Sequence, residues 1–186
     1  MRLGAFLVLS LILTGVAGQA ARADLVTNGN FATGDFTGWV TSDSSIVIDT
    51  FYTPPYNSDV YDAAFTGTGI LSQVLATTAG MGYTLSFSVL DDSPFFLDTF
   101  TVTLGGFSAV VYGSDASSYT METFNVPGSD ILGGDTLSFQ GSALFGDWHL
   151  DDVSLVPTVA PEPPAGAILV GAVLMVLSLR RRGRSA

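Results

Sequence analysis

The segment "YTLSFSV" (residues 83–89) decides the fold, because two kinds of residue alternate along it. Large apolar side chains occupy every second position and small hydroxyl-bearing ones stand between them: Tyr83, Leu85, Phe87 and Val89, separated by Thr84, Ser86 and Ser88. Successive side chains of a strand point to opposite faces of a sheet. This period of two therefore predicts a strand with one buried face.

The same alternation recurs at residues 99–104 and 136–140. Glycine-rich turns separate such stretches, and Gly105-Gly106, between "FTVTL" and "FSAVVY", predicts a hairpin. The pattern predicts an all-β fold of about eight to ten short strands. We expect an antiparallel, jelly-roll-like β-sandwich over residues 24–157.

Charge is distributed unevenly along the chain. All six basic residues lie in the terminal segments, whereas sixteen of the seventeen acidic residues lie between Asp24 and Pro157, which gives that part a formal charge of −16. Such a surface attracts cations and repels nucleic acid, whose binding requires cationic side chains. The chain has no cysteine, so disulfides and thiol chemistry are excluded.

Residues 1–23 have the three parts of a secretory signal peptide. Arg2 supplies an early positive charge, residues 3–16 form an apolar run, and Ala21-Arg22-Ala23 has the small residues of a cleavage site. We expect cleavage between Ala23 and Asp24 and export of the mature chain.

The chain ends in a second apolar segment. Residues 164–179 carry no charge, and as a helix they would span about 24 Å, short of a bilayer core of about 30 Å. The arginines that follow favour a cytoplasmic end, and residues 158–164 form a proline-rich linker. We expect a precursor held at the inner membrane, with the linker exposed to a processing enzyme.

The order Pro161-Glu162-Pro163, apolar helix and arginine cluster (Arg180, Arg181 and Arg182) resembles the PEP-CTERM sorting signal of Gram-negative bacteria. The resemblance covers residues 161–186 and implies that an exosortase, a membrane transpeptidase-like enzyme, recognises and removes the tail. It also implies a final place on the cell surface or in the extracellular matrix, in association with exopolysaccharide or biofilm.

The body of the chain carries a second, looser resemblance. "LVTNGNFATGDFTGW" (residues 25–39) and "GDWHLDDVSL" (residues 146–155) are similar to the first and last strands of galactose-binding-like jelly rolls, as in several carbohydrate-binding modules. Residues 71–89 fit the middle of the same pattern. The resemblance implies carbohydrate binding or adhesion, with extracellular polysaccharide as the partner.

The same resemblance implies a structural calcium where the first and last strands meet. Its ligands would be backbone carbonyls at Asn28, a glutamate and an aspartate of the pair Asp151-Asp152; this chain departs from the pattern because Ala32 stands at the position of the glutamate. Independently, the apolar phase of the last strand changes at the two aspartates, which predicts a β-bulge. The bulge could turn a carboxylate toward calcium, and the alternative is a solvated aspartate pair.

Aromatic residues give candidate sugar contacts. The stretch "FYTPPYNSDVY" (residues 51–61) is loop-like and contains three tyrosines. Its candidate contacts are Tyr52, Tyr56, Asn57 and Tyr61, and the alternative is a loop packed by its own tyrosines. Trp39 and Trp148 are further candidates, with core packing as the alternative for each.

No catalytic residue is predicted. His149 is the only histidine, residues 24–157 contain no lysine, and the nucleophile, zinc-hydrolase and phosphate-loop motifs are missing from the sequence. We expect an exported carbohydrate-binding or adhesive protein. The alternatives are a purely structural matrix protein without a specific ligand and, less favoured, a glycan-acting enzyme.

The sorting signal predicts that the mature surface protein lacks residues 165–186. Mass spectrometry of protein recovered from the cell surface or the medium should find C-terminal peptides that end near Pro161-Glu162-Pro163. An intact tail on the surface protein would overturn this prediction.

Overall fold

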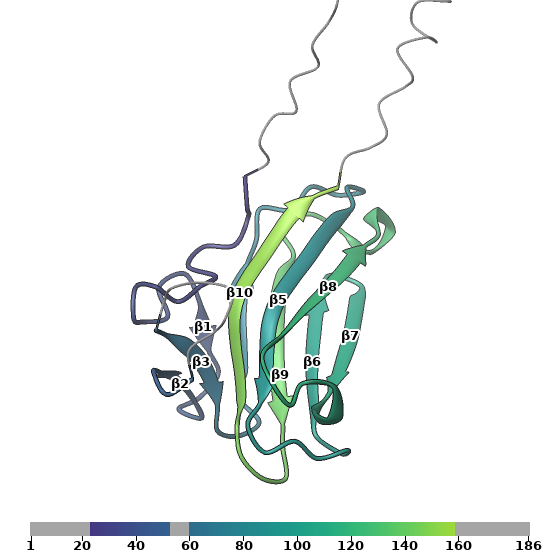
Figure 1. The fold of residues 1–186 in the computed structure, drawn as a ribbon. Coiled ribbons are helices and arrows are strands. Elements are labelled where there is room, and N and C mark those ends of the chain that lie inside the picture. Colours follow the sequence, from purple (N-terminus) through teal and green to yellow (C-terminus); the bar gives the residue numbers. More distant parts are fainter. Residues whose placement is uncertain (1–22, 53–59, 159–186) are drawn as a thin grey trace, which may run out of the picture.

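Ten strands form two antiparallel sheets in the computed structural model, which describes residues 23–52 and 60–158 (Figure 1). The strands are β1 (Val40–Thr41), β2 (Ile46–Asp49), β3 (Asp62–Phe65), β4 (Ile70–Val74), β5 (Tyr83–Asp91), β6 (Thr99–Leu104), β7 (Phe107–Tyr112), β8 (Thr120–Val126), β9 (Thr136–Ser142) and β10 (Trp148–Pro157). Two short 3-10 helices, η1 (Gly113–Asp115) and η2 (Gly128–Asp130), stand on either side of β8.

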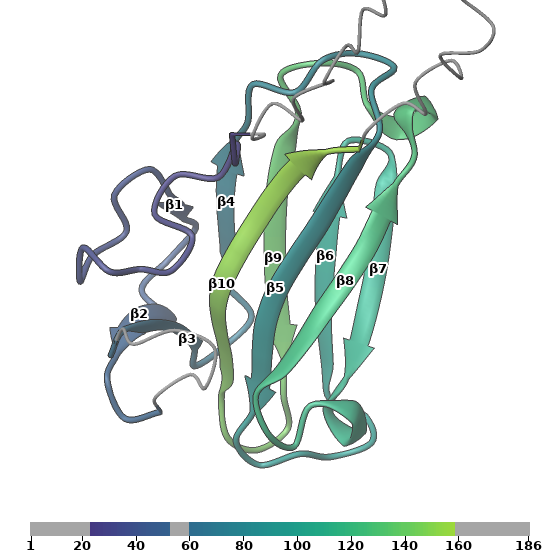
Figure 2. The ribbon, with the colours of Figure 1, turned by 45° about the horizontal axis from the view of Figure 1, so that its top comes forward.

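The two sheets lie face to face, with β10, β5 and β8 in front of β9, β6 and β7 in Figure 2. The front sheet has the strand order β2-β3-β10-β5-β8, and the back sheet has the order β1-β4-β9-β6-β7. All pairs of neighbouring strands are antiparallel. The arrangement confirms the antiparallel, jelly-roll-like sandwich that the alternating segments predicted.

Aromatic rings fill much of the core between the sheets. The four apolar side chains of residues 83–89 are at most 1% exposed, as their alternation predicted. From the opposite sheet, the Phe139 ring centroid lies 5.1 Å from that of Phe87 and 5.8 Å from that of Phe100. The described residues contain no lysine or arginine, so apolar packing and backbone hydrogen bonds hold the sheets together.

The hairpin predicted at Gly105-Gly106 joins β6 to β7. Leu104 pairs with Phe107 across the turn, and Gly105 has a φ of 57°. A residue with a Cβ rarely adopts this conformation, which explains the glycine.

The buried face of β10 changes at Asp151-Asp152. The pairing of β10 with β5 shifts register between Asp151 and Ser154, and Asp152 has a φ of 52°. Apolar side chains reach the core on both sides of this point although they stand in opposite phases: Trp148, Leu150, Val153 and Leu155. The predicted β-bulge is confirmed.

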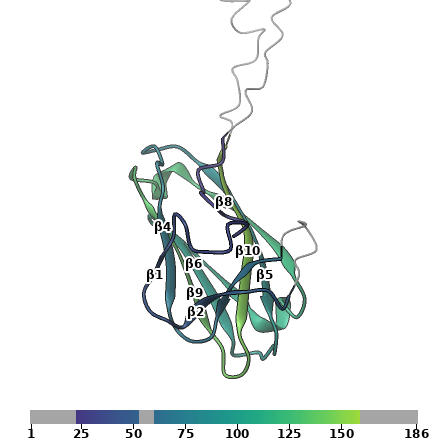
Figure 3. The same ribbon diagram turned by 90° about the vertical axis from the view of Figure 1, so that its left-hand side faces the viewer.

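The prediction of a first strand within residues 25–39 is wrong. This stretch forms turns, and β1 begins only at Val40. Positive φ angles at Asn28 (51°) and Phe31 (49°), and at two glycines that follow, bend the backbone repeatedly. The segment nevertheless lies beside the end of β10 (Figure 3), where the Leu25 amide donates to the Leu155 carbonyl over 3.0 Å.

Several predicted features lie outside the described residues. These are the signal peptide up to residue 22, the tail from residue 159 with its sorting motif and apolar helix, and the segment that contains Tyr56 and Asn57. Within residues 23–52 and 60–158, no helix is long and apolar enough to cross a membrane.

Replacing Phe139 by alanine tests the importance of the aromatic core. The ring is fully buried, so its loss should lower the free energy of unfolding by about 3–5 kcal/mol. Phe96→Ala removes an exposed ring and should change it by less than about 0.5 kcal/mol. Urea unfolding of the full chain measures both; equal losses would mean that the core does not depend on Phe139.

Candidate functional site

The side chain of His149 points away from the core, to the outer face of the front sheet. It lies between Trp148 and Leu150 in sequence, both of which are buried in the core. Its neighbours across the sheet are Ala64 of β3 and Leu90 of β5. The small Ala64 side chain leaves space beside the imidazole, and a cavity opens there.

This cavity has a volume of about 300 Å³. It combines aromatic rings with carboxylates, and its lining comes from β2 and the segment after it, from β3, and from the adjoining ends of β5 and β10. The lining residues are Val47, Asp49, Phe51, Tyr52, Ala64, Thr66, Asp92, Asp147 and His149. Phe51 is 79% exposed and stands at the mouth.

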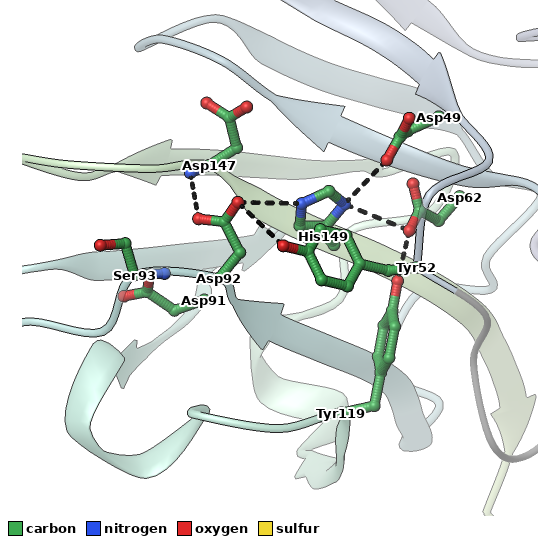
Figure 4. Close-up of polar contacts among 9 residues, drawn as sticks. All are labelled: Asp49, Tyr52, Asp62, Asp91, Asp92, Ser93, Tyr119, Asp147 and His149. Atoms are coloured by element: carbon green, nitrogen blue, oxygen red, sulfur yellow. Dashed lines mark hydrogen bonds and ion pairs between the residues drawn. The ribbon is translucent and has the colours of Figure 1, made fainter.

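Carboxylates surround the imidazole of His149 on both sides (Figure 4). Nδ1 lies 3.2 Å from an oxygen of Asp62 and 3.9 Å from an oxygen of Asp49. Nε2 faces an oxygen of Asp92 at 3.9 Å. His149 is only 2% exposed, and it is the only basic side chain among the described residues.

Two tyrosines complete the surroundings of this histidine. The ring of Tyr52 packs edge-on against the imidazole with the centroids 4.5 Å apart, and its hydroxyl donates to Asp92 over 3.4 Å. The Tyr119 hydroxyl donates to the Asp62 oxygen that also contacts His149. Burial, and after it the negative charge of Asp62, raises the pKa of Tyr119, so the hydroxyl remains a donor.

The electrostatics of the site favour positive charge. Burial alone would lower the pKa of His149, but the hydrogen bond with Asp62 and the charges of Asp62, Asp92 and Asp49 outweigh it, so the pKa is raised. The pKa of Asp147 is also raised, by burial and then by the charge of Asp92. Negative charge from several carboxylates contributes to both shifts.

The structure brings one of the predicted tyrosines to this cavity. Tyr52 lines it, whereas Tyr61 packs against the core and approaches Gly34. The two tryptophan candidates require a correction. Trp39 is 6% exposed and Trp148 is fully buried, so their rings contact other core aromatics and neither offers a face to a ligand.

The predicted calcium ligands are only partly brought together. Asn28 and Asp152 line a second cavity, of about 350 Å³, beside the middle of β10. Asp151 does not line it and is fully buried. The Asn28 side chain donates to the Asp35 carbonyl over 2.9 Å, which ties down the turn of residues 28–35. Calcium at this position remains a prediction.

Sequence reasoning did not single out Asp49 and Asp62, the two carboxylates that face Nδ1 of His149. Asp49 ends β2 and Asp62 begins β3, and the two are paired across the sheet. The sequence contained one signal for this site. His149 stands between Trp148 and Leu150 in a strand, so its side chain points to the face of the sheet opposite to theirs.

The fold and the cavity together define a β-sandwich with a polar and aromatic site on its outer face. The sequence matches no known protein family and no curated protein sequence. Solved structures do match. TmCBM61 in complex with β-1,4-galactotriose is 17% identical with a TM-score of 0.55, over 73% of this chain and 99% of that chain.

A second similar structure is the CBM22-1 xylan-binding domain of Xyn10C from Paenibacillus barcinonensis. It is 14% identical with a TM-score of 0.54, over 75% of this chain and 97% of that chain. Both are carbohydrate-binding modules. At these identities the likeness establishes a shared jelly-roll fold.

A buried carboxyl group next to the site gives a pH-dependent prediction. Burial raises the pKa of Asp91 from 3.8 to about 6; Asp98 and Asp92 add to this shift and a hydrogen bond from Ser93 opposes it. Between about pH 4 and pH 6 the folded chain keeps a proton that the unfolded chain releases. The stability contributed by this proton is therefore present at low pH and lost as the pH rises through 6.

The substitution Asp91→Asn removes this titration and keeps an oxygen to accept the Ser93 amide. Relative to the unaltered chain, the variant should gain about 2 kcal/mol in free energy of unfolding between pH 4.5 and pH 7.5. Denaturant unfolding at both values measures the difference. Asp115→Asn, at an exposed position, is the control, and an equal trend in both variants would contradict the assignment.

Proposed function

We propose that this protein is an exported, non-catalytic carbohydrate-binding protein and that the cavity beside His149 is its sugar site. The observation that carries the proposal is the composition of the cavity, where Phe51 and Tyr52 stand next to the carboxylates of Asp49, Asp92 and Asp147. Few surfaces combine exposed aromatic rings with several hydrogen-bond acceptors in one concave site.

The chemistry of this lining suits a polyhydroxylated ligand. Aromatic rings offer apolar faces on which a sugar ring can pack. Ionised carboxylates only accept hydrogen bonds, so they match sugar hydroxyls, which donate them. The formal charge of −16 on residues 24–157 opposes an acidic glycan. The favoured ligand is therefore a neutral polysaccharide or oligosaccharide.

The comparisons support this class of ligand. Of the two similar structures, one is in complex with β-1,4-galactotriose and the other is described as a xylan-binding domain. The shared fold gives this chain a sheet surface on which such a ligand can lie.

The location follows from the sequence of the two ends. We propose export by the signal peptide, retention at the inner membrane by residues 164–179, and release by an exosortase that recognises Pro161-Glu162-Pro163. The protein would then act on the cell surface or in the matrix, in contact with exopolysaccharide. Structural calcium near Asn28 and Asp152 is part of the same proposal.

A glycan array tests the function directly. The full chain, solubilised in mild detergent, is applied with calcium and again with a chelator, and saturable binding to one class of neutral glycan is expected. Phe51→Ala and Tyr52→Ala should each weaken that binding about tenfold, since removing an aromatic contact at a binding site typically costs more than 1 kcal/mol.

The control variant is Tyr112→Ala, which removes an exposed aromatic ring from the back sheet and should leave binding unchanged. Loss of binding with chelator that is restored by Ca²⁺ and not by Zn²⁺ would support the calcium. If no glycan binds saturably, the protein is a structural matrix component. If binding persists in both cavity variants, the sugar site lies elsewhere.

A further inference from the structure

Three potential metal ligands converge beside the cavity, and two of them, Asp49 and His149, line it. They are Asp49 of β2, Asp62 of β3 and His149 of β10, which stand side by side because these strands are adjacent in the front sheet. One ligand atom from each lies within 4.8 Å of the other two. In Figure 4 the Nδ1 atom of His149 faces both carboxylates.

Buried atoms without partners mark this cluster as more than a group of surface acids. Asp62 is fully buried and its Oδ1 has no hydrogen-bond partner. His149 is likewise buried; its Nε2 also has no hydrogen-bond partner, but it lies on the side of the ring away from Asp49 and Asp62. In Figure 4 the second oxygen of Asp62 lies on the side of Asp49, within the cluster. Leaving such atoms unsatisfied is costly, so the site favours an additional group.

We propose that Asp49, Asp62 and His149 Nδ1 bind a divalent cation of the zinc class. Zinc bonds to histidine nitrogen and carboxylate oxygen are about 2.0–2.2 Å long. Two atoms at about 2.1 Å from one ion and 3.2 Å apart, as for His149 and Asp62, subtend about 100°, near the tetrahedral angle. The 3.9 Å from His149 to Asp49 corresponds to about 136° at the same bond length, so a small movement of Asp49 completes the geometry.

The ligand set distinguishes zinc from calcium. Calcium takes about six to eight oxygen ligands, whereas imidazole nitrogen suits zinc and its neighbours in the transition series. Three protein ligands leave a fourth position open. Asp49 retains 30% of its side-chain exposure and lines the cavity, so the open position and the route of entry both face the cavity.

Surrounding residues provide the support that a metal site requires. The Tyr119 hydroxyl donates to Asp62 and fixes the orientation of that carboxylate. On the far side of the imidazole, Asp92 faces Nε2 at 3.9 Å. At this distance Asp92 accepts no hydrogen bond from Nε2, but its negative charge favours a proton on that nitrogen, which leaves Nδ1 as the ligand.

The chain contains a single histidine, which makes the test direct. The full chain, produced without a histidine tag and labelled with ¹⁵N, is titrated with Zn²⁺ and followed by long-range ¹H–¹⁵N correlation of the imidazole. The expected result is saturation at one equivalent, with the Nδ1 resonance moving to the position of a metal-bound nitrogen. This readout does not depend on glycan binding, so it can succeed or fail independently of the proposed function.

Variants locate the ion. Asp49→Asn, at a partly exposed position, should weaken Zn²⁺ binding at least tenfold in calorimetry, and Asp62→Asn should do the same while keeping an acceptor for Tyr119. Asp115→Asn makes the same charge change at an exposed position and should leave the affinity unchanged. A parallel titration with Ca²⁺ should leave the imidazole resonances in place.

Three results would overturn the proposal. The first is no Zn²⁺ binding at millimolar concentration, with an imidazole that only gains and loses protons. The second is binding that leaves the imidazole resonances unchanged. The third is equal affinity in Asp49→Asn and the unaltered chain.

Discussion

The absence of lysine and arginine from the described residues is the constraint on which this structure depends. No carboxylate among these residues can pair with a lysine or an arginine, and many of them accept hydrogen bonds from backbone amides instead. Asp98 accepts from Phe95 and Leu144 and thereby joins two loops at one end of the sandwich. Aspartates that accept at least one backbone amide are Asp24, Asp35, Asp43, Asp91, Asp92, Asp98 and Asp135. Acidic residues thus hold the turns in place.

The two carboxylates beside Nδ1 of His149 are an exception to this pattern of hydrogen bonds from backbone amides. Asp49 and Asp62 face the imidazole, and no backbone amide of residues 23–52 and 60–158 donates to either carboxylate. The only basic group of the described residues therefore lies among carboxylates. The bulge in β10 makes this arrangement possible. It allows the strand to fill the core on both sides of Asp151-Asp152 while His149 stays on the outer face.

Much of the fold could be predicted because it rests on local alternation. In residues 83–89 the alternation of apolar and polar residues predicts which side chains are buried. In β10 the change in this alternation at Asp151-Asp152 predicts the bulge. β3 could not be read in this way, because its sequence "DAAF" is buried at every position. The site was harder to predict than the fold, because its residues come from segments that are far apart in the sequence. Of the residues that line the cavity, only Tyr52 was predicted as a ligand contact. Trp39 and Trp148 pack against other aromatic rings in the core.

β10 also determines how the protein would respond to a mechanical load. His149 stands near its first residue and Pro157 is its last, which separates the cavity from the C-terminal end by about 26 Å. Along this length β10 is bonded to β5 on one side and to β3 and then residues 25–29 on the other. Tension between a ligand in the cavity and the C-terminal end would run parallel to the strand. Its hydrogen bonds would be loaded together, in shear, instead of being peeled apart one at a time.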